Sequence, residues 1–254
     1  MPQRLSLDAT TLAWLLRVQG PSLGLWRAAE IAALRGCEYA RPILDLGCGD
    51  GLVSATVLDQ IEAGIDPDPH ALQKAAHTGL YGTLENAFVE DSRLPDDQFG
   101  TIISNSVLEH IPNLQSVLVK ARGLLRPGGR LIFTVPTEQF SESLAFPSRR
   151  YSAWRNRQLC HLNLWPESRW RDALENAGFR LVTVRPYLQQ RLVFYWDVLE
   201  LLQQVRLARR RLFGIAWRRL PPRVIHSFAS RISRLDFSAP APGGGRLVIA
   251  QRPS

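Results

Sequence analysis

Cysteine is scarce in this sequence of 254 residues, which contains only Cys37, Cys48 and Cys160. Three widely spaced cysteines are too few for a disulfide framework or a zinc cluster, so we expect a reducing, cytoplasmic setting. Long hydrophobic runs are also missing. No window of about 18 uncharged apolar residues occurs, and we therefore predict no membrane-spanning helix. Arg17 interrupts the best apolar stretch near the start, so we predict no signal peptide.

Acidic residues are few in the second half of the chain. Residues 1–119 carry 7 Lys and Arg against 15 Asp and Glu, a net charge of −8. Residues 120–254 carry 24 against 8, a net charge of +16. This imbalance predicts two parts with different tasks. The acidic part suits a cationic ligand, and the basic part suits an acidic partner.

Short apolar runs alternate with helical patterns from residue 42 onward, which predicts a parallel sheet covered by helices. The strands are expected over residues 42–46, 61–66, 87–91, 101–106, 130–136, 180–187 and 245–252. The helices between them are expected over residues 52–60, 69–79, 113–125 and 166–179.

Two further segments extend beyond this alternation. Residues 1–40 contain two amphipathic helical patterns, and residues 188–244 are too many for a loop between two strands. We therefore divide the chain into N-terminal helices (1–40), a ligand-binding domain (41–187 with 245–254), and a basic, mainly helical insertion (188–244).

The sequence "ILDLGCGDG" places three glycines in five positions directly after an apolar strand. Such a turn presents backbone N–H groups to a ligand without Cβ atoms in the way. A phosphate-binding P-loop is excluded because no Gly-Lys-Ser/Thr follows, and Leu52 stands where the dinucleotide fingerprint needs its third glycine. Asp66 ends the next strand, where a carboxylate can accept both hydroxyls of an unphosphorylated ribose. The pattern therefore predicts a nucleoside site.

Four segments together resemble a known family: "ILDLGCGDG", "GIDPDP", "VEDSRLPDDQFGTIISNSVLEHIPN" and "LLRPGGRLIFTVP". In order and spacing they are similar to class I S-adenosylmethionine-dependent methyltransferases, in particular to the small-molecule group that includes quinone-ring methylases. The resemblance implies an α/β fold, a Rossmann-like three-layer sandwich. Its seven-stranded, mostly parallel sheet would have helices on both faces, with the helical insertion before the last strand. It also implies S-adenosylmethionine as cofactor and S-adenosylhomocysteine as product. We expect no metal, because the acidic cluster that a catechol-type metal site would require is missing around "ISNS".

The resemblance assigns the methionine part of the cofactor to the glycine turn. Gly47 and Gly49 would pass under it, with Cys48 between them, and Asp45 would lie near its ammonium group. A sulfonium with an ammonium is cationic, so acidic surroundings suit it.

The nucleoside part is assigned to the next two strand ends. Asp66, followed by Pro67, would bind the ribose, although Asp66 could instead cap the following helix. Asp91 would bind the adenine amino group and Ser92 a ring nitrogen through its backbone. Glu90 takes the role of Asp91 if the strand is shifted by one residue.

The acceptor side is expected after the fourth strand. Asn105, Ser106 and Val107 would line the methionine side, and Glu109 and His110 would face the acceptor. His110 is the candidate base because imidazole titrates near neutrality, and the alternative is that it only shapes the pocket. His161, in the irregular stretch after the fifth strand, is a second catalytic candidate. Its alternative is ordinary packing.

The insertion is rich in arginine. Residues 189–235 carry ten arginines against Asp197 and Glu200. Apolar residues keep near-helical spacing, and Phe213 and Trp217 add aromatic bulk. A basic amphipathic helix over residues 191–220 is typical of a segment that lies on an anionic membrane surface. The alternative is a soluble lid or dimer contact whose arginines are merely solvated.

The acceptor itself is predicted only by class. Base-modifying methyltransferases carry Asn/Asp-Pro-Pro-aromatic after the fourth strand, but "SNSVLEH" stands there, so nucleic acid is not expected. A small-molecule or lipid-linked acceptor remains, with the protein cytoplasmic or peripheral on the inner face of a membrane. A second hypothesis is a non-catalytic S-adenosylmethionine-binding protein that docks a partner or membrane through its insertion.

Overall fold

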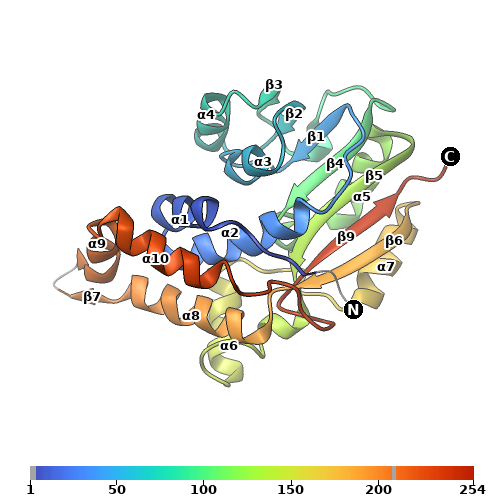
Figure 1. The fold of residues 1–254 in the computed structure, drawn as a ribbon. Coiled ribbons are helices and arrows are strands. Elements are labelled where there is room, and N and C mark those ends of the chain that lie inside the picture. Colours follow the sequence, from blue (N-terminus) through green and yellow to red (C-terminus); the bar gives the residue numbers. More distant parts are fainter. Residues whose placement is uncertain (1–3, 208–209) are drawn as a thin grey trace. The chain divides into compact units, whose positions relative to one another are not determined.

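The computed structural model describes residues 4–207 and 210–254, and it divides into two compact units (Figure 1). The first unit comprises Met1–Gly36, Glu138–Arg157 and Pro186–Gly245, and the second comprises Cys37–Thr137, Gln158–Arg185 and Arg246–Ser254. The first unit thus gathers the N-terminal helices and the segment interpreted as an insertion. The three-part division predicted from the sequence stays a prediction.

The second unit contains a seven-stranded sheet in the order β3-β2-β1-β4-β5-β9-β6. From β3 to β5, neighbouring strands in this order pair in parallel. This confirms the predicted α/β fold with a mostly parallel sheet. The strands are β1 (Ile43–Leu46), β2 (Ile61–Ile65), β3 (Tyr81–Glu85), β4 (Phe99–Asn105), β5 (Leu125–Pro136), β6 (Arg180–Tyr187) and β9 (Gly245–Gln251).

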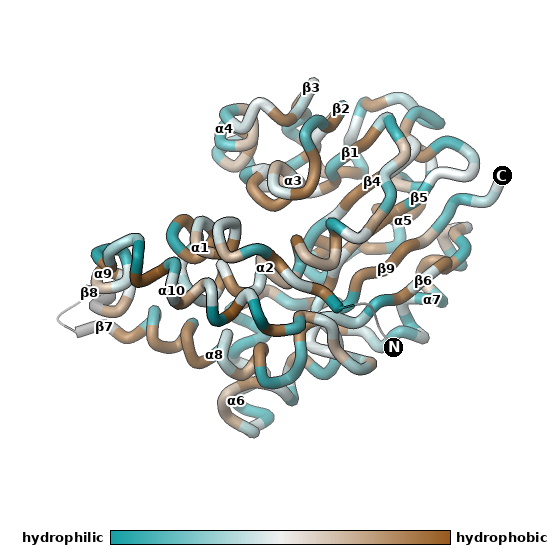
Figure 2. Tube along the Cα trace, in the orientation of Figure 1, coloured by the Kyte–Doolittle hydropathy of each residue, from teal (hydrophilic) through white to brown (hydrophobic). Residues whose placement is uncertain are grey.

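The central strands form the core of this unit because their side chains are apolar on both faces. All four residues of β1 are buried, and β4 is buried along its first six residues. Figure 2 shows these strands as largely hydrophobic. Helices pack around the sheet, and they are α3 (Leu52–Val57), α4 (Pro69–His77), α5 (Leu114–Leu124) and α7 (Glu167–Asn176).

The prediction of a strand over residues 87–91 is wrong. The third strand is β3, and Val89–Asp91 form a short 3-10 helix instead. β3 lies at the edge of the sheet and reads YGTLE, with no buried residue, so it lacks the apolar run by which the other strands were found. The apolar run at 87–89 is partly solvent-facing, since Phe88 is 64% exposed.

The first unit is helical. Its helices are α1 (Ala9–Val18), α2 (Pro21–Leu34), α6 (Arg149–Gln158), α8 (Gln190–Gln204), α9 (Leu212–Arg218) and α10 (Pro222–Ile232). The rings of Trp26, Phe140 and Trp196 pack against one another with centroids 5.3–5.7 Å apart. This aromatic cluster joins α2 to α8.

A buried ion pair fastens α6 to α8. Arg155 Nε donates to Asp197 Oδ1 at 2.8 Å, and both side chains are almost fully buried. The other oxygen of Asp197 accepts from the Tyr151 hydroxyl at 2.6 Å and from the Ala145 amide at 3.0 Å. A buried charge pair is tolerated when its remaining lone pairs are hydrogen-bonded in this way. The network fixes the orientation of α6 on α8.

The single amphipathic helix expected over residues 191–220 is interrupted. α8 ends at Gln204, then Arg206–Leu207 pairs with Arg210–Arg211 in a two-stranded hairpin, and α9 follows. Ala208 and Arg209 lie outside the described residues. Basic residues are favoured just beyond a helix C-terminus, because the last carbonyl groups of the helix carry a partial negative charge. No helix in the described residues is long and apolar enough to cross a membrane.

Candidate active site

The turn after β1 brings the glycine-rich segment to the carboxyl end of the sheet. The amides of Gly47 and Cys48 both donate to Ile65 O, at 2.8 and 3.0 Å, which ties the turn to the end of β2. Gly47 has φ +71°, and a Cβ on it would lie 2.6 Å from both methyl groups of Val107. Gly49 has φ +56°, and a Cβ there would meet nothing within 4 Å. The turn therefore needs glycine at residue 47 for packing, and it leaves open space at residue 49.

Asp66 closes this turn from the adjacent strand end. Its Oδ2 accepts from the Gly49 amide at 2.8 Å, and its Oδ1 accepts from the Asp68 amide at 2.9 Å. The N-cap role considered for Asp66 belongs to Asp68, whose side chain accepts from His70 N. A carboxylate has about four acceptor positions, so two remain on Asp66 for the hydroxyls of a ligand.

A cavity of about 480 Å³ opens beside this turn. It combines an apolar wall with a few polar groups and lies in the size range of small-molecule sites. Its predicted residues are Gly47, Asp66, Pro67, Ser106, Val107 and His110, together with Glu90, the alternative to Asp91. The remaining residues of the lining are Leu46, Ile65, Ala87, Phe88, Val89, Ile111, Pro112 and Asn113.

Several predicted residues lie outside the lining of this cavity. Asp91 is exposed and does not line it, whereas Glu90, the alternative, does. Ser92 is buried and donates through Oγ to Glu85 Oε2 at 2.7 Å. Glu85 also accepts from the Arg93 amide at 2.9 Å. Sequence reasoning missed Glu85, because β3 was not recognised and its last residue was therefore not seen as a strand end.

Asp45 supports the turn from beneath and is not part of the lining. It is 2% exposed, and its Oδ2 accepts from Ser54 Oγ and from the Tyr81 hydroxyl, each at 2.6 Å. Burial raises the pKa of the Asp45 carboxyl to about 6; the two hydrogen bonds lower it and the neighbouring Asp66 charge raises it. Direct contact of Asp45 with an ammonium group stays a prediction.

The pH dependence of stability tests this environment. Because the folded pKa of Asp45 is raised above its ordinary value of 3.8 to about 6, its contribution is full below about pH 4 and is lost as the pH rises through 6. Two pKa units correspond to about 3 kcal/mol. Asp45→Asn keeps one oxygen that can accept both hydrogen bonds. We expect this variant to gain up to about 3 kcal/mol over wild type between pH 4 and 8.

Urea unfolding at a series of pH values measures this difference. Asp59→Asn, at an exposed position near the end of α3, is the matched control and should follow wild type. Parallel stability curves for wild type and Asp45→Asn would contradict a raised pKa at Asp45.

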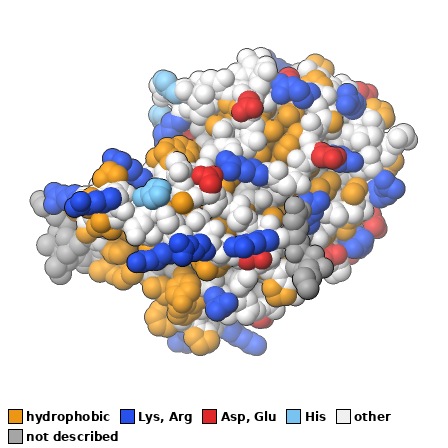
Figure 3. All heavy atoms as spheres, in the orientation of Figure 1, with side chains coloured by type: hydrophobic (Ala, Val, Ile, Leu, Met, Phe, Trp, Pro, Cys, Tyr) orange, Lys and Arg blue, Asp and Glu red, His pale blue; other side chains and the backbone are white. Residues whose placement is uncertain are grey.

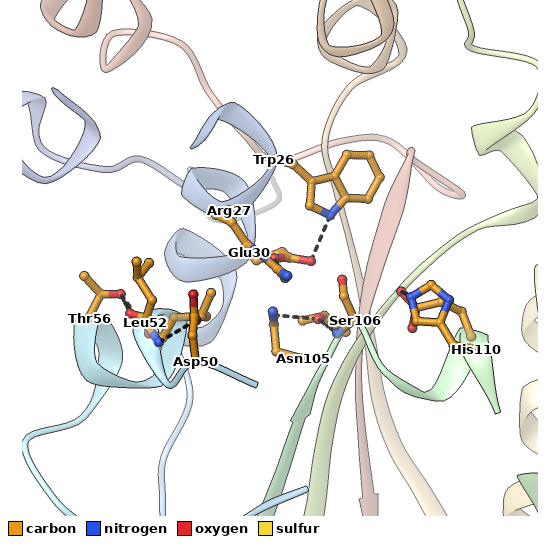
Figure 4. A network of polar contacts seen from close by, with 12 residues as sticks. Trp26, Arg27, Glu30, Asp50, Leu52, Thr56, Asn105, Ser106 and His110 are labelled. Carbon is orange, nitrogen blue, oxygen red and sulfur yellow. Dashed lines mark hydrogen bonds and ion pairs between the residues drawn. The ribbon is translucent and has the colours of Figure 1, made fainter. Parts of the chain in front are cut away.

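The end of β4 holds Asn105 and Ser106. Ser106 is a non-glycine residue with φ +51°, and its amide donates to the carbonyl and hydroxyl oxygens of Thr134, at 3.0 and 3.1 Å. The Thr134 hydroxyl donates to Asn105 Oδ1 at 2.8 Å. Figure 4 shows Asn105 and Ser106 side by side at the strand end. A strained backbone held by several bonds is common at functional sites, and Ser106 lines the cavity.

The two catalytic candidates are brought together. The rings of His110 and His161 stack with centroids 5.6 Å apart. His110 Nδ1 lies 3.0 Å from the carbonyl oxygen of Cys160, and its Nε2 lies 3.8 Å from Glu109 Oε1. A carbonyl only accepts, so Nδ1 carries the proton and the Nε2 lone pair of the neutral ring is available. His161 does not line the cavity itself.

The segment around residue 161 is held in place by backbone contacts. The amides of Leu162 and Asn163 donate to Glu109 O at 2.8 and 3.0 Å. The Asn163 side chain donates to Leu108 O and Ile111 O, each at 2.8 Å. Asn163 is buried and was not singled out from the sequence, because a lone Asn in an irregular stretch gives no signal of long-range bonding.

A separate polar group lies in the first unit. Trp26 Nε1 donates to Glu30 Oε1 at 2.8 Å, and Arg27 Nη1 donates to Glu30 Oε2 at 2.7 Å (Figure 4). Glu30 is fully buried, and the Arg27 side chain is 24% exposed. The carboxylate thus fixes both neighbours on one face of α2. Within the described residues, no three His, Cys, Asp or Glu side chains gather as metal ligands would.

Comparisons with known proteins decide the family. A family model described as a methyltransferase domain matches residues 25–184, more than half of the chain. The chain belongs to the methyltransferase family. Its membership implies S-adenosylmethionine as the methyl donor.

The chain is similar to curated methyltransferases over part of its length. An uncharacterized methyltransferase of Mycobacterium bovis is 29% identical over 127 residues, which cover 48% of this chain and 57% of the relative. The ubiquinone biosynthesis O-methyltransferase of Vibrio atlanticus is 27% identical over 113 residues, covering 42% and 48%. The chain thus spans about half the length of the curated relatives it matches.

A solved structure extends the likeness in fold. An S-adenosylmethionine-dependent methyltransferase of Thermotoga maritima superposes with a TM-score of 0.62 at 14% identity, covering 90% of this chain and 89% of that chain. At this identity, the likeness concerns the fold and leaves the acceptor open.

Proposed function

We propose that the protein transfers a methyl group from S-adenosylmethionine to a small-molecule or lipid-linked acceptor, by direct in-line displacement and without a metal. The observation that carries the proposal is the Asp66 carboxylate, which lines the cavity beside the glycine turn with two acceptor positions left. A ribose diol fills these two positions, and no phosphate group is needed to complete the site.

The rest of the cavity suits the other parts of this cofactor. Ile65, Phe88 and Val89 offer an apolar surface for an adenine ring, and Glu90 lies on the same wall for its amino group. Gly47 and Ser106 line the cavity on the side of the β1 and β4 strand ends. We therefore assign the methionine part to these two residues and the adenine amino group to Glu90 in place of Asp91.

Bound S-adenosylmethionine supplies an activated methyl group on a positively charged sulfur. The chain then has to hold the acceptor in line with the bond between the sulfur and the methyl group, and it has to keep water away. Positioning of the acceptor and an apolar cavity accomplish these two tasks. His110 takes the proton from an acceptor hydroxyl or amine through its Nε2. Glu109, 3.8 Å from that nitrogen, stabilises the resulting imidazolium.

Calorimetry tests the cofactor assignment. We expect S-adenosylmethionine and S-adenosylhomocysteine to bind in the micromolar range, about −8 kcal/mol. Asp66→Ala removes charged hydrogen bonds and should weaken binding by about 1.5–3 kcal/mol, or roughly 10- to 150-fold. Asp68→Asn is the matched control, since it removes one carboxylate two residues away and Asn still caps α4.

Each part of this function has an outcome that would contradict it. Absence of heat with both compounds, or tighter binding of NAD, would overturn the cofactor. Binding without release of S-adenosylhomocysteine in the presence of a lipid extract would favour the non-catalytic alternative. We expect turnover to survive treatment with a metal chelator. Loss of turnover after this treatment would overturn the proposal that no metal is needed.

A further inference from the structure

One face of α8 is apolar and exposed. Tyr195, Val198, Leu202 and Val205 follow one another at intervals of three and four residues, so they lie on one side of the helix, with Phe194 beside them. Tyr195 and Val205 are each 57% exposed, and Phe194 and Leu202 are 42% and 41% exposed. The opposite side of α8 carries the buried Leu192, Val193 and Trp196. The helix therefore has two apolar faces, and the first unit uses only one.

Exposed aromatic residues at α6 lie beside α8. The Tyr151 ring contacts Phe146 and Trp154, with centroids 5.1 and 5.6 Å apart. Phe146 is 56% exposed and Trp154 is 39% exposed. The Tyr151 hydroxyl bonds Asp197 of α8, which places this group beside the helix. Figure 3 shows hydrophobic side chains gathered over α6 and α8, with Lys and Arg side chains nearby. We call this surface the apolar face, and its residues are Phe146, Trp154, Phe194, Tyr195, Leu202 and Val205.

Exposed arginines accompany the apolar face. Arg191 lies on the same side of α8 as Tyr195, one turn earlier, and α6 carries the exposed Arg149, Arg150 and Arg157. The first unit contains 18 Lys and Arg against 7 Asp and Glu, a net charge of +11, whereas the second unit contains 13 against 16, a net charge of −3. The positive charge of the protein thus belongs to the unit that carries the apolar face.

We propose that the apolar face docks on an anionic lipid surface. A lipid interface accepts apolar side chains below the headgroups and attracts arginines to the charged headgroups, so it satisfies both halves of this surface. A second copy of the chain fits less well, because pairing through this face would bring the same arginines against one another.

This proposal moves the contact away from two of the residues that the sequence suggested. Trp217 Nε1 donates to Leu16 O at 2.8 Å, and its ring contacts Phe213 and Phe228. Trp217 is therefore engaged inside the first unit. The link between docking and the acceptor rests on the proposed function, because a methyl-transferring protein on a membrane surface would meet lipid-linked acceptors directly.

Sedimentation with vesicles tests the docking. Wild type is expected to pellet with vesicles of phosphatidylcholine and phosphatidylglycerol at low salt, but not with phosphatidylcholine alone, and added salt should weaken binding. Phe194→Gln with Tyr195→Gln should weaken it about tenfold or more, because apolar burial is lost. Arg149→Gln with Arg150→Gln should weaken it about fivefold for each arginine. The matched controls are Val119→Gln and Arg126→Gln, both exposed in the second unit, and they should bind as wild type does.

Three results would overturn the proposal: wild type that stays in the supernatant, equal binding to neutral and anionic vesicles, or aromatic variants that bind as wild type does. Sedimentation velocity without vesicles tests whether a second copy of the chain occupies the apolar face instead. The second copy would be its partner if wild type formed a dimer that the aromatic variant alone loses, and if wild type did not bind vesicles. Calorimetry with S-adenosylmethionine on the same preparations separates the two proposals, because vesicle binding can fail while cofactor binding stays intact.

Discussion

Gly47→Ala is expected to destabilise the protein by about 2–5 kcal/mol, because the new Cβ meets two separate costs. The backbone at residue 47 has φ +71°, where an L-residue is strained. The Cβ would also lie 2.6 Å from both Val107 methyl groups. A β-branched side chain such as Val107 has few rotamers in which to move away, so the backbone of the turn has to shift. Urea unfolding, followed by calorimetry with S-adenosylmethionine, measures the loss of stability and of the site.

Two variants separate these costs. Gly49→Ala adds a Cβ at φ +56° with nothing within 4 Å, so it should cost only the backbone strain, about 1–2 kcal/mol. Val107→Ala removes the methyl groups that Gly47→Ala would strike. We expect the double variant to be more stable than the sum of the single losses predicts, by about 1–2 kcal/mol. Equal costs at residues 47 and 49, with no coupling to Val107, would contradict the close packing of this turn.

The glycine turn and Asp66 could be predicted from the sequence because their signal is local. Three glycines after an apolar strand leave few other conformations, and the carboxylate follows at the end of the next strand. The parallel sheet could also be predicted from the sequence, since its buried strands appear there as continuous apolar runs. In the structure Asp66 does meet the turn, through the Gly49 amide at 2.8 Å.

Edge strands and long-range partners could not be predicted in the same way. β3 has no buried residue, so its pattern is that of a surface segment, and with it Glu85 and the role of Tyr81 under Asp45 were missed. The meeting of His110 with Cys160 and His161 spans about fifty residues of sequence and depends on tertiary folding, which no local periodicity encodes.

The interrupted helix has a different cause. Apolar residues keep helical spacing past Gln204, but spacing alone does not reveal where backbone hydrogen bonding ends.

The division of the chain into an acidic half and a basic half was also only an approximation. The net charges of +11 and −3 follow compact units assembled from separate segments, and a division at one residue cannot reproduce them.

His110→Ala is expected to lower turnover by about 10²–10⁴-fold, the usual cost of losing a general base. The carbonyl of Cys160 lies 3.0 Å from Nδ1, so the neutral ring keeps its proton there and its Nε2 can accept another. Glu109 Oε1, 3.8 Å from Nε2, favours the protonated product of that step. If His110 only shaped the pocket, its loss would misplace the acceptor, which costs at most about 10²-fold.

The pH–rate profile distinguishes these roles more sharply than the size of the loss. With His110 as base, turnover measured as S-adenosylhomocysteine release from a lipid extract falls toward low pH, and this limb disappears in His110→Ala. His161→Gln is the matched control: it alters the stacked partner but keeps Nε2 of His110, so it should lower turnover less and retain the limb. Nitrogen chemical shifts of the His110 ring test the geometry without any acceptor, because they report which nitrogen carries the proton. A proton on Nε2 of the neutral ring, or an unchanged acid limb in His110→Ala, would remove His110 from the chemistry and leave it a wall of the cavity.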